Sequence, residues 1–175
     1  MGRPKALVEL DGEPLVRRAL RVLADGGCAP RIVVLGAAAE AVRAVLPEGV
    51  TAVEAIDWAE GMGASLRAGL AALPAVDAVL VHLVDLPGVT SAAVARLAAG
   101  AGSATLRRAA YHGRPAHPVV LGREHWAAVA AVATGDAGAR DYLKGHPDLE
   151  LVECADVAAP DDVDTPDALS RWLRG

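Results

Sequence analysis

The sequence predicts an α/β fold: a three-layer, Rossmann-like and mostly parallel sheet with helices on both faces. Short apolar segments rich in β-branched residues alternate with segments whose leucines and valines recur at helical spacing, as in parallel α/β proteins. Residues 78–87 (AVLVHLVDLP) begin as a nearly unbroken apolar run, which is typical of a strand buried on both faces. The length of 175 residues suits one domain over residues 1–175.

Strands and helices are expected to alternate along the chain. Asp11 and Gly12 form a turn signal, and Pro14 suits the first turn of a helix because its φ is already helical. Segment 111–121 is expected to form a small antiparallel addition at the sheet edge. The expected strands cover residues 31–35, 50–56, 78–85, 104–110, 118–121 and 149–154. The expected helices cover residues 14–23, 38–46, 64–73, 91–98, 124–132, 137–143 and 166–173.

The composition excludes several classes of protein. The formal net charge is −5, which argues against broad nucleic-acid binding because such binding needs a basic face. No uncharged run approaches the length of a membrane span, and no signal peptide is recognisable, so no membrane partner is expected. Cys28 and Cys154 lack metal-ligand spacing. A cytoplasmic location with reduced cysteines is therefore expected.

Two aspartates are candidate metal ligands. Asp85 is expected at the carboxyl end of a buried strand, because Pro87 cannot donate to a sheet ladder. Ligands of open α/β sheets bind outside such ends, and a carboxylate there can hold Mg²⁺ against phosphates. From position alone, Asp85 is an equally good cap for the Pro87-Gly88 turn. Asp164, followed by Thr165 and Pro166, has the same two interpretations, and capping of the last helix is the favoured one.

A lysine and a glycine-bearing loop are candidate anion-binding groups. Lysine occurs only at Lys5 and Lys144, against fifteen arginines. Where arginine is the usual basic residue, a lysine is well suited to bind phosphate as a compact point charge. An isolated lysine is, however, more often a solvated surface residue. Residues 61–65 (GMGAS) run into a helix N-terminus, which either accepts an anion or is an ordinary strand-to-helix connection. Arg67 faces the same anion or solvent.

The histidines provide a weaker signal. His117 precedes Pro118 and either contacts a substrate or is a structural residue. His112 and His117 lack zinc-ligand spacing, so no zinc site is expected. The spacing of the nucleophilic residues indicates no catalytic triad.

Six short segments, in order along nearly the whole chain, resemble motifs of the molybdenum cofactor nucleotidyltransferases. This family has the nucleotide-diphospho-sugar transferase fold, and its molybdopterin cytidylyltransferase branch is the most similar. The segments are residues 1–7 (MGRPKAL), 61–69 (GMGASLRAG), 84–87 (VDLP), 113–118 (GRPAHP), 135–140 (GDAGAR) and 163–166 (VDTP).

The resemblance implies a reaction and its participants. A Mg²⁺-dependent nucleotidyltransferase of this kind moves a nucleoside monophosphate from CTP, or from GTP, to the terminal phosphate of molybdopterin and releases pyrophosphate. The nucleophile is already an anion, so positioning and charge neutralisation suffice without a strong general base. A molybdoenzyme or its chaperone is a further expected partner.

The same resemblance implies roles for particular residues. Lys5 would contact the triphosphate and, with Asp85, serve catalysis, and Asp85 and Asp164 would hold Mg²⁺. His117 and segment 135–140 would lie towards the second substrate, with His117 among the binding residues. The other residues expected to bind the nucleotide or base are Gly61, Gly63, Ser65 and Arg67.

One part of the family pattern has no counterpart in the sequence. The family begins with a strand followed by Leu-Ala-Ala-Gly-x-x-x-Arg-Met-Gly, whereas this sequence starts at the Met-Gly. Either the start codon is placed too late, or the chain is an N-terminally truncated or degenerate relative. As given, the chain is expected to be poorly active and marginally stable, because loss of a central strand exposes a ladder edge. The alternative function is a truncated relative that binds molybdenum cofactor and delivers it without turnover.

Overall fold

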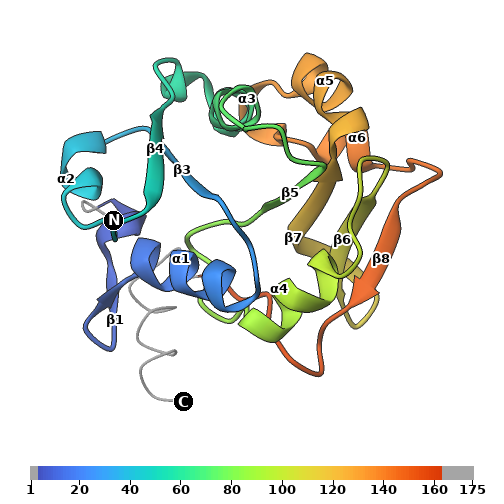
Figure 1. The fold of residues 1–175 in the computed structure, drawn as a ribbon, viewed down its shortest axis with the longest axis horizontal. Helices are drawn as coiled ribbons and strands as arrows, with labels where there is room; N and C mark the ends of the chain where they lie inside the picture. The colour runs from blue at the N-terminus through green and yellow to red at the C-terminus, as the bar shows by residue number, and fades with distance from the viewer. Residues whose placement is uncertain (1–3, 163–175) are drawn as a thin grey trace.

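Figure 1 shows the computed structural model of the chain, which describes residues 4–162. The expected alternation of strands and helices is present, and the α/β class is confirmed. Asp164 and the expected helix 166–173 lie outside the described residues. The helices are α1 (Leu15–Asp25), α2 (Ala39–Arg43), α3 (Met62–Ala71), α4 (Ser91–Ala98), α5 (Arg123–Val132) and α6 (Arg140–Leu143). The strands are β1 (Glu9–Leu10), β2 (Glu13–Pro14), β3 (Arg31–Leu35), β4 (Val50–Glu54), β5 (Ala78–Val81), β6 (Leu106–Tyr111), β7 (Arg114–Gly122) and β8 (Glu150–Glu153).

Within residues 4–162 the strands form three sheets. β1 and β2 make a hairpin whose turn residues Asp11 and Gly12 have φ values of 53° and 79°, the left-handed pair of a type I′ turn. β3 and β4 pair in parallel. The third sheet has the order β5-β7-β6-β8, in which β6 and β8 are parallel and β7 is antiparallel to both its neighbours.

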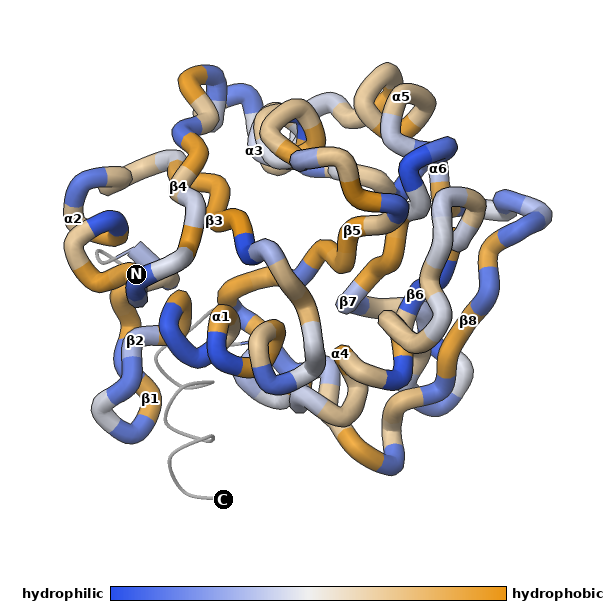
Figure 2. Tube along the Cα trace, in the orientation of Figure 1, coloured by the Kyte–Doolittle hydropathy of each residue, from blue (hydrophilic) through white to orange (hydrophobic). Residues whose placement is uncertain are grey.

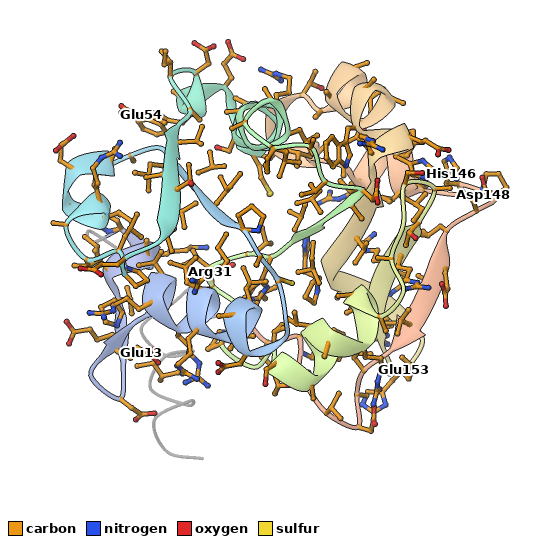
Figure 3. All side chains as sticks on the ribbon, in the orientation of Figure 1. Glu13, Arg31, Glu54, His146, Asp148 and Glu153 are labelled. Carbon is orange, nitrogen blue, oxygen red and sulfur yellow. The ribbon has the colours of Figure 1, made fainter. Side chains whose placement is uncertain are left out.

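Segment 111–121 was expected at the sheet edge, and this expectation is wrong. Most of the segment belongs to β7, which lies between β5 and β6. The two-residue turn His112-Gly113, with φ of 52° and 75°, folds β7 directly back on β6 and so makes the pair antiparallel. Glu153 at the end of β8 (Figure 3) accepts hydrogen bonds of 3.0 Å from the N–H groups of both turn residues. The sheets are consequently more mixed than the alternating pattern predicts.

The strand expected over residues 78–85 is shorter in the structure, where β5 ends at Val81. β5 pairs with β7 up to Val81 opposite Val119. The next facing residue of β7 is Pro118, which has no N–H to donate, so pairing stops and Asp85 lies in the loop beyond. All four residues of β5 are only partly buried, not buried on both faces as expected, because one edge of the strand carries no neighbour in the described sheet.

Helices cover both faces of the sheet, as expected. α3 and α5 lie on one side and α1 and α4 on the other (Figure 1). Side chains of β7 alternate between the two sides, since Val119 and Leu121 join the cluster with Val129 of α5, while Val120 joins the cluster with Leu97 of α4. Figure 2 shows that apolar residues also run along β3 and β5.

Two helix N-termini differ from the expected ones, and each difference has a local cause in the backbone or its cap. α4 has the expected bounds, but Thr90 rather than Ser91 caps it by accepting a 3.3 Å hydrogen bond from the N–H of Ala93. The helix expected from residue 137 begins only at Arg140. Gly138 has a φ of 54°, which is incompatible with a continuous right-handed helix.

Candidate active site

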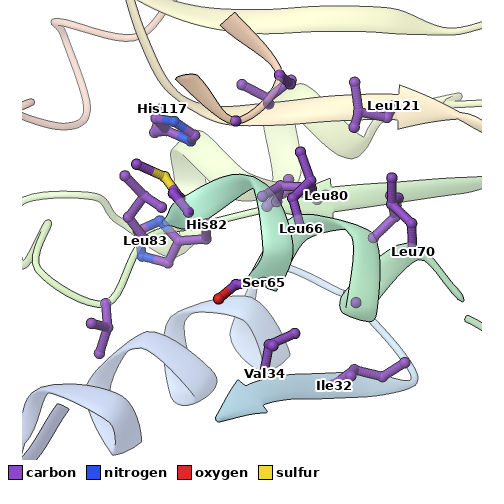
Figure 4. A pocket seen from close by; sticks show the side chains of 18 of the residues that line it. Ile32, Val34, Ser65, Leu66, Leu70, Leu80, His82, Leu83, His117 and Leu121 are labelled. Carbon is purple, nitrogen blue, oxygen red and sulfur yellow. The ribbon is translucent and has the colours of Figure 1, made fainter. Parts of the chain in front are cut away.

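A cavity of about 480 Å³ lies between β3 and β5 (Figure 4). Most of its lining is apolar, from β3, β5, α1, α3 and β7. His82, His117 and Arg108 lie near one another at the end where β5 leads into the loop that carries Asp85. The polar side chains of the lining are Ser65, His82, Arg108, His117, Asp136 and Arg140.

Lys5 and Asp85, eighty residues apart in sequence, form an ion pair. The Nζ of Lys5 donates to Oδ2 of Asp85 at 2.8 Å, and the two side chains are 41% and 18% exposed. Lys5 begins a short 3₁₀ turn (Lys5–Leu7), and Asp85 follows β5. The structure therefore brings together the two residues expected to serve catalysis.

Asp85 can supply some, but not all, of the ligands that a hard cation needs. Its carboxylate supplies the oxygen donors that Mg²⁺ prefers, and Mg²⁺ commonly takes only one or two protein carboxylates. Among residues 4–162 no cluster of three or more His, Cys, Asp or Glu side chains is arranged to hold a metal. A cation at Asp85 would therefore complete its shell with ligands from outside this part of the chain, from substrate and from water.

The N-terminal turn of α3 is packed against segment 133–136. A Cβ added at Gly61 would lie 2.6 Å from the carbonyl oxygen of Gly135, and one added at Gly63 would lie 2.7 Å from that of Ala133. Oδ1 of Asp136 accepts a 3.4 Å hydrogen bond from the N–H of Met62. The glycines expected to bind nucleotide thus also permit this close contact.

Arg67 of α3 contacts both segment 133–136 and the turn that precedes the helix. Its guanidinium donates to the carbonyl of Ala133 and, at 3.1 Å, to Oε2 of Glu60. Ser65 of the same helix lines the cavity (Figure 4). In this arrangement Arg67 positions segment 133–136, and Ser65 is the side chain of the expected nucleotide loop that reaches the cavity.

The lining contains two histidines with buried, unpartnered nitrogens. The Nδ1 atoms of His82 and His117 are buried without a hydrogen-bond partner. Burial, aided by the nearby His117, lowers the pKa of His82 to about 4 against an opposing effect of Asp85. Burial also lowers the pKa of His117, partly offset by a hydrogen bond to the Val81 backbone. Both rings are neutral at pH 7 and can accept a proton or a hydrogen bond from a ligand.

Two arginines place positive charge at the same end of the cavity. Burial and the neighbouring Arg140 both lower the pKa of Arg108, and its Nε donates to the carbonyl of Ala116 at 3.0 Å. Two guanidinium groups that both stay charged repel each other, and an anion bound between them relieves this repulsion. Sequence reasoning missed Arg108 and His82. His82 had one signal, a polar residue inside an otherwise apolar run, whereas Arg108 had none.

Comparison with known proteins places the chain in a family. Residues 1–151 match the MobA-like NTP transferase domain. The chain belongs to this family. A protein of Paenarthrobacter nicotinovorans named nicotine blue oxidoreductase is 40% identical over 184 residues, which cover 99% of this chain and 90% of that protein.

Solved structures agree with this membership. Rv0371c of Mycobacterium tuberculosis H37Rv is 28% identical, with a TM-score of 0.83 over 100% of this chain and 91% of that one. Its complex with manganese has a TM-score of 0.81 at 28% identity, over 99% and 94% of the two chains. The chain is thus an NTP transferase of the MobA-like family, and a similar protein binds a divalent metal.

The tight packing at Gly61 predicts a large effect for Gly61→Ala in this MobA-like chain. Gly61 has a φ of 113° and a ψ of −175°, a region almost restricted to glycine, and the new methyl group would also collide with Gly135. We expect the free energy of unfolding to fall by about 2–4 kcal/mol in urea denaturation.

Gly12→Ala is the matched control for this variant. Gly12 has a φ of 79° but no atom within 4 Å of the added Cβ, so only backbone strain of about 1–2 kcal/mol is expected. Equal losses for the two variants would show that the contact between α3 and segment 133–136 does not form.

Proposed function

We propose that this chain is a Mg²⁺-dependent nucleotidyltransferase that moves a nucleoside monophosphate from CTP or GTP to the terminal phosphate of molybdopterin. The observation that carries the proposal is the Lys5–Asp85 pair, 2.8 Å apart, beside a cavity whose polar end holds arginines and neutral histidines. Membership of the MobA-like NTP transferase family supports the reaction type. The manganese complex of Rv0371c supports a divalent metal.

In the proposed reaction a phosphate oxygen of the acceptor attacks the α-phosphorus of the triphosphate. The bond between that phosphorus and the bridging α–β oxygen breaks, and pyrophosphate leaves with the electron pair. A divalent metal, when bound, neutralises charge on the phosphates and orients them. Asp85 would hold it, with Asp164 as the second carboxylate.

The other side chains bind and orient. Lys5 exchanges its carboxylate partner for a phosphate oxygen and so balances the charge that develops on the leaving group. Arg108 and Arg140 hold the acceptor phosphate at the polar end of the cavity. His117, neutral at pH 7, accepts a hydrogen bond from the acceptor. No residue needs to remove a proton, because the attacking phosphate is already ionised.

A second candidate function, oxidoreduction, is favoured by the name of the relative that is 40% identical. The apolar walls of the cavity suit an uncharged, apolar molecule. The same purified protein can test both proposals.

The test measures pyrophosphate released from CTP, GTP and ATP with molybdopterin and either Mg²⁺ or Mn²⁺. We expect release from CTP or GTP that requires both the acceptor and the metal. Manganese binding is measured in parallel by electron paramagnetic resonance, so that loss of folding is recognised. A folded, Mn²⁺-binding protein that binds molybdopterin without turnover supports the delivery function instead, and reduction of a dye acceptor by an added reductant, without CTP or GTP, supports the oxidoreductase.

A further inference from the structure

The strands β6 and β7 lose their regular pairing beside the cavity. Pairing along β7 is regular as far as Val119 and resumes only at Pro115. On β6 the partners of these two residues, Arg108 and Ala110, have a single residue between them. Residues 116–118 therefore form a β-bulge opposite one residue of β6. A bulge bends its strand and re-aims a side chain, and bulges are over-represented next to active sites.

Side chains of β6 donate hydrogen bonds to the backbone of this bulge. Nε of Arg108 donates to the carbonyl of Ala116 at 3.0 Å. The hydroxyl of Tyr111 donates to the carbonyl of His117 at 3.1 Å. The next residue, Pro118, is fully buried and has a φ that its ring fixes. The backbone of His117 is therefore held at its own carbonyl and at both neighbouring residues.

The position of Tyr111 is fixed by packing and by the turn that follows it. Tyr111 is only 3% exposed and packs in one cluster with Leu97 of α4 and with Val120. The carboxylate of Glu153 holds the turn 112–113 through two hydrogen bonds. Burial raises the pKa of Tyr111 to about 12, so its hydroxyl stays protonated at neutral pH and remains a hydrogen-bond donor.

The ring of His117 presents an unpaired acceptor to the cavity. His117 lines the cavity near His82 (Figure 4), and its Nδ1 is buried without a hydrogen-bond partner. The hydrogen bond between the ring and the Val81 backbone raises the pKa of His117 against the larger lowering effect of burial, so the ring donates in that bond. A neutral ring that donates through its other nitrogen has Nδ1 as an acceptor. This atom can take a hydrogen bond from an N–H or O–H group of a ligand only where the bulge places it.

We infer that Tyr111 is a positioning residue for the acceptor substrate, because its hydroxyl holds the bulge that aims Nδ1 of His117 at the acceptor. The inference rests on the proposed function, in which His117 accepts a hydrogen bond from the acceptor. Tyr111 is not part of the cavity lining, so it acts through His117 and not by contact with a substrate. Lys5 and Asp85, which would bind the triphosphate and the metal, belong to other segments. Loss of the Tyr111 hydroxyl should therefore weaken acceptor binding and leave nucleotide binding unchanged.

The substitution Tyr111→Phe removes the hydroxyl and keeps the buried ring. We expect the KM for molybdopterin to rise about 5–10-fold, while the KM for CTP or GTP stays within about twofold of the wild type. Trp126→Phe is the matched control, because the indole N–H of Trp126 also donates to a carbonyl of β7, that of Leu121 at 2.9 Å, outside the bulge. The control should lower the melting temperature at least as much as Tyr111→Phe does, and it should leave both KM values within about twofold of the wild type.

The ring nitrogens of His117 give a second measurement, which needs no turnover. We expect Tyr111→Phe to shift or broaden the His117 ring signals in ¹⁵N NMR spectra, in which a His117→Asn sample assigns them. The signals of His125, whose ring nitrogens contact the hydroxyl of Tyr142 and the carbonyl of Ala104, should stay unchanged.

These measurements separate the inference from the proposed function. A wild-type protein without any transfer would end the proposed function, while the His117 signals would still show whether Tyr111 places the ring. The inference is overturned if Tyr111→Phe leaves the KM for the acceptor unchanged, raises both KM values equally, or leaves the His117 signals unmoved. If Tyr111→Phe does not fold, Glu153→Gln replaces it, because Glu153 is exposed and its loss weakens the turn after Tyr111. A smaller rise, in the KM for the acceptor alone, is then expected, and no rise overturns the inference.

Discussion

Asp85→Asn should lower nucleotidyl transfer by at least about 100-fold while leaving the protein folded. The amide keeps the size of the side chain but removes the charge that would hold a divalent metal and pair with Lys5. Loss of one transition-state charge contact typically costs 10²–10³-fold in kcat, or about 3–4 kcal/mol. The effect on stability should be small, because the partner Lys5 is 41% exposed and such pairs contribute about 1 kcal/mol or less.

Rate and metal affinity should change together in this variant. Pyrophosphate release and Mn²⁺ affinity are measured on the same preparation, and the melting temperature serves as the check on folding. Asp77→Asn is the matched control, because Asp77 forms a 3.0 Å ion pair with Arg123 at the surface, away from the cavity lining. Its rate should stay within about twofold of the wild type. An Asp85→Asn protein with unchanged Mn²⁺ affinity would remove Asp85 from the metal site.

The sequence predicted elements best where local signals are complete. β3 has the bounds expected from its β-branched residues, and α4 has the bounds expected from its apolar spacing. The length of β5 was not predictable, because it depends on which residue of β7 faces Val81 and on Pro118 lacking an N–H. Strands that pair across about forty residues of sequence leave no signal in the local sequence of either strand.

The candidate site was predicted to a different degree for each residue. Lys5 and Asp85 were each singled out, and the family resemblance assigned them to one site, where the structure pairs them. Arg67 was expected to face an anion or solvent, and it donates to Ala133 and Glu60, contacts that only the folded loop creates. His82 looked like part of a buried strand, and its place in the cavity lining with an unpartnered Nδ1 shows only in the folded structure.

The histidine pair predicts a loss of stability in mild acid. The pKa of His82 is about 4 in the folded protein and about 6.5 in an unfolded chain. The free energy of unfolding therefore keeps its full value, as far as His82 is concerned, above pH 6.5. It declines as the pH falls towards 4, because the unfolded chain takes up a proton that the folded protein does not. This gap corresponds to roughly 3 kcal/mol at about 1.4 kcal/mol per pH unit. The lowered pKa of His117 acts in the same direction.

Urea denaturation between pH 7 and pH 5 measures this effect, in a window where most carboxylates are still ionised. The free energy of unfolding should decrease steadily through the window, and His82→Leu should flatten the dependence, leaving only the part due to His117. His112→Asn is the matched control, because His112 is exposed in the β6–β7 turn and asparagine tolerates its φ of 52°. Equal slopes for wild type and His82→Leu would mean that solvent reaches the His82 ring and that the cavity end beside Asp85 is open to water. Protection of that ring matters for the proposed reaction, since water at this end would compete with the acceptor phosphate for the nucleotide.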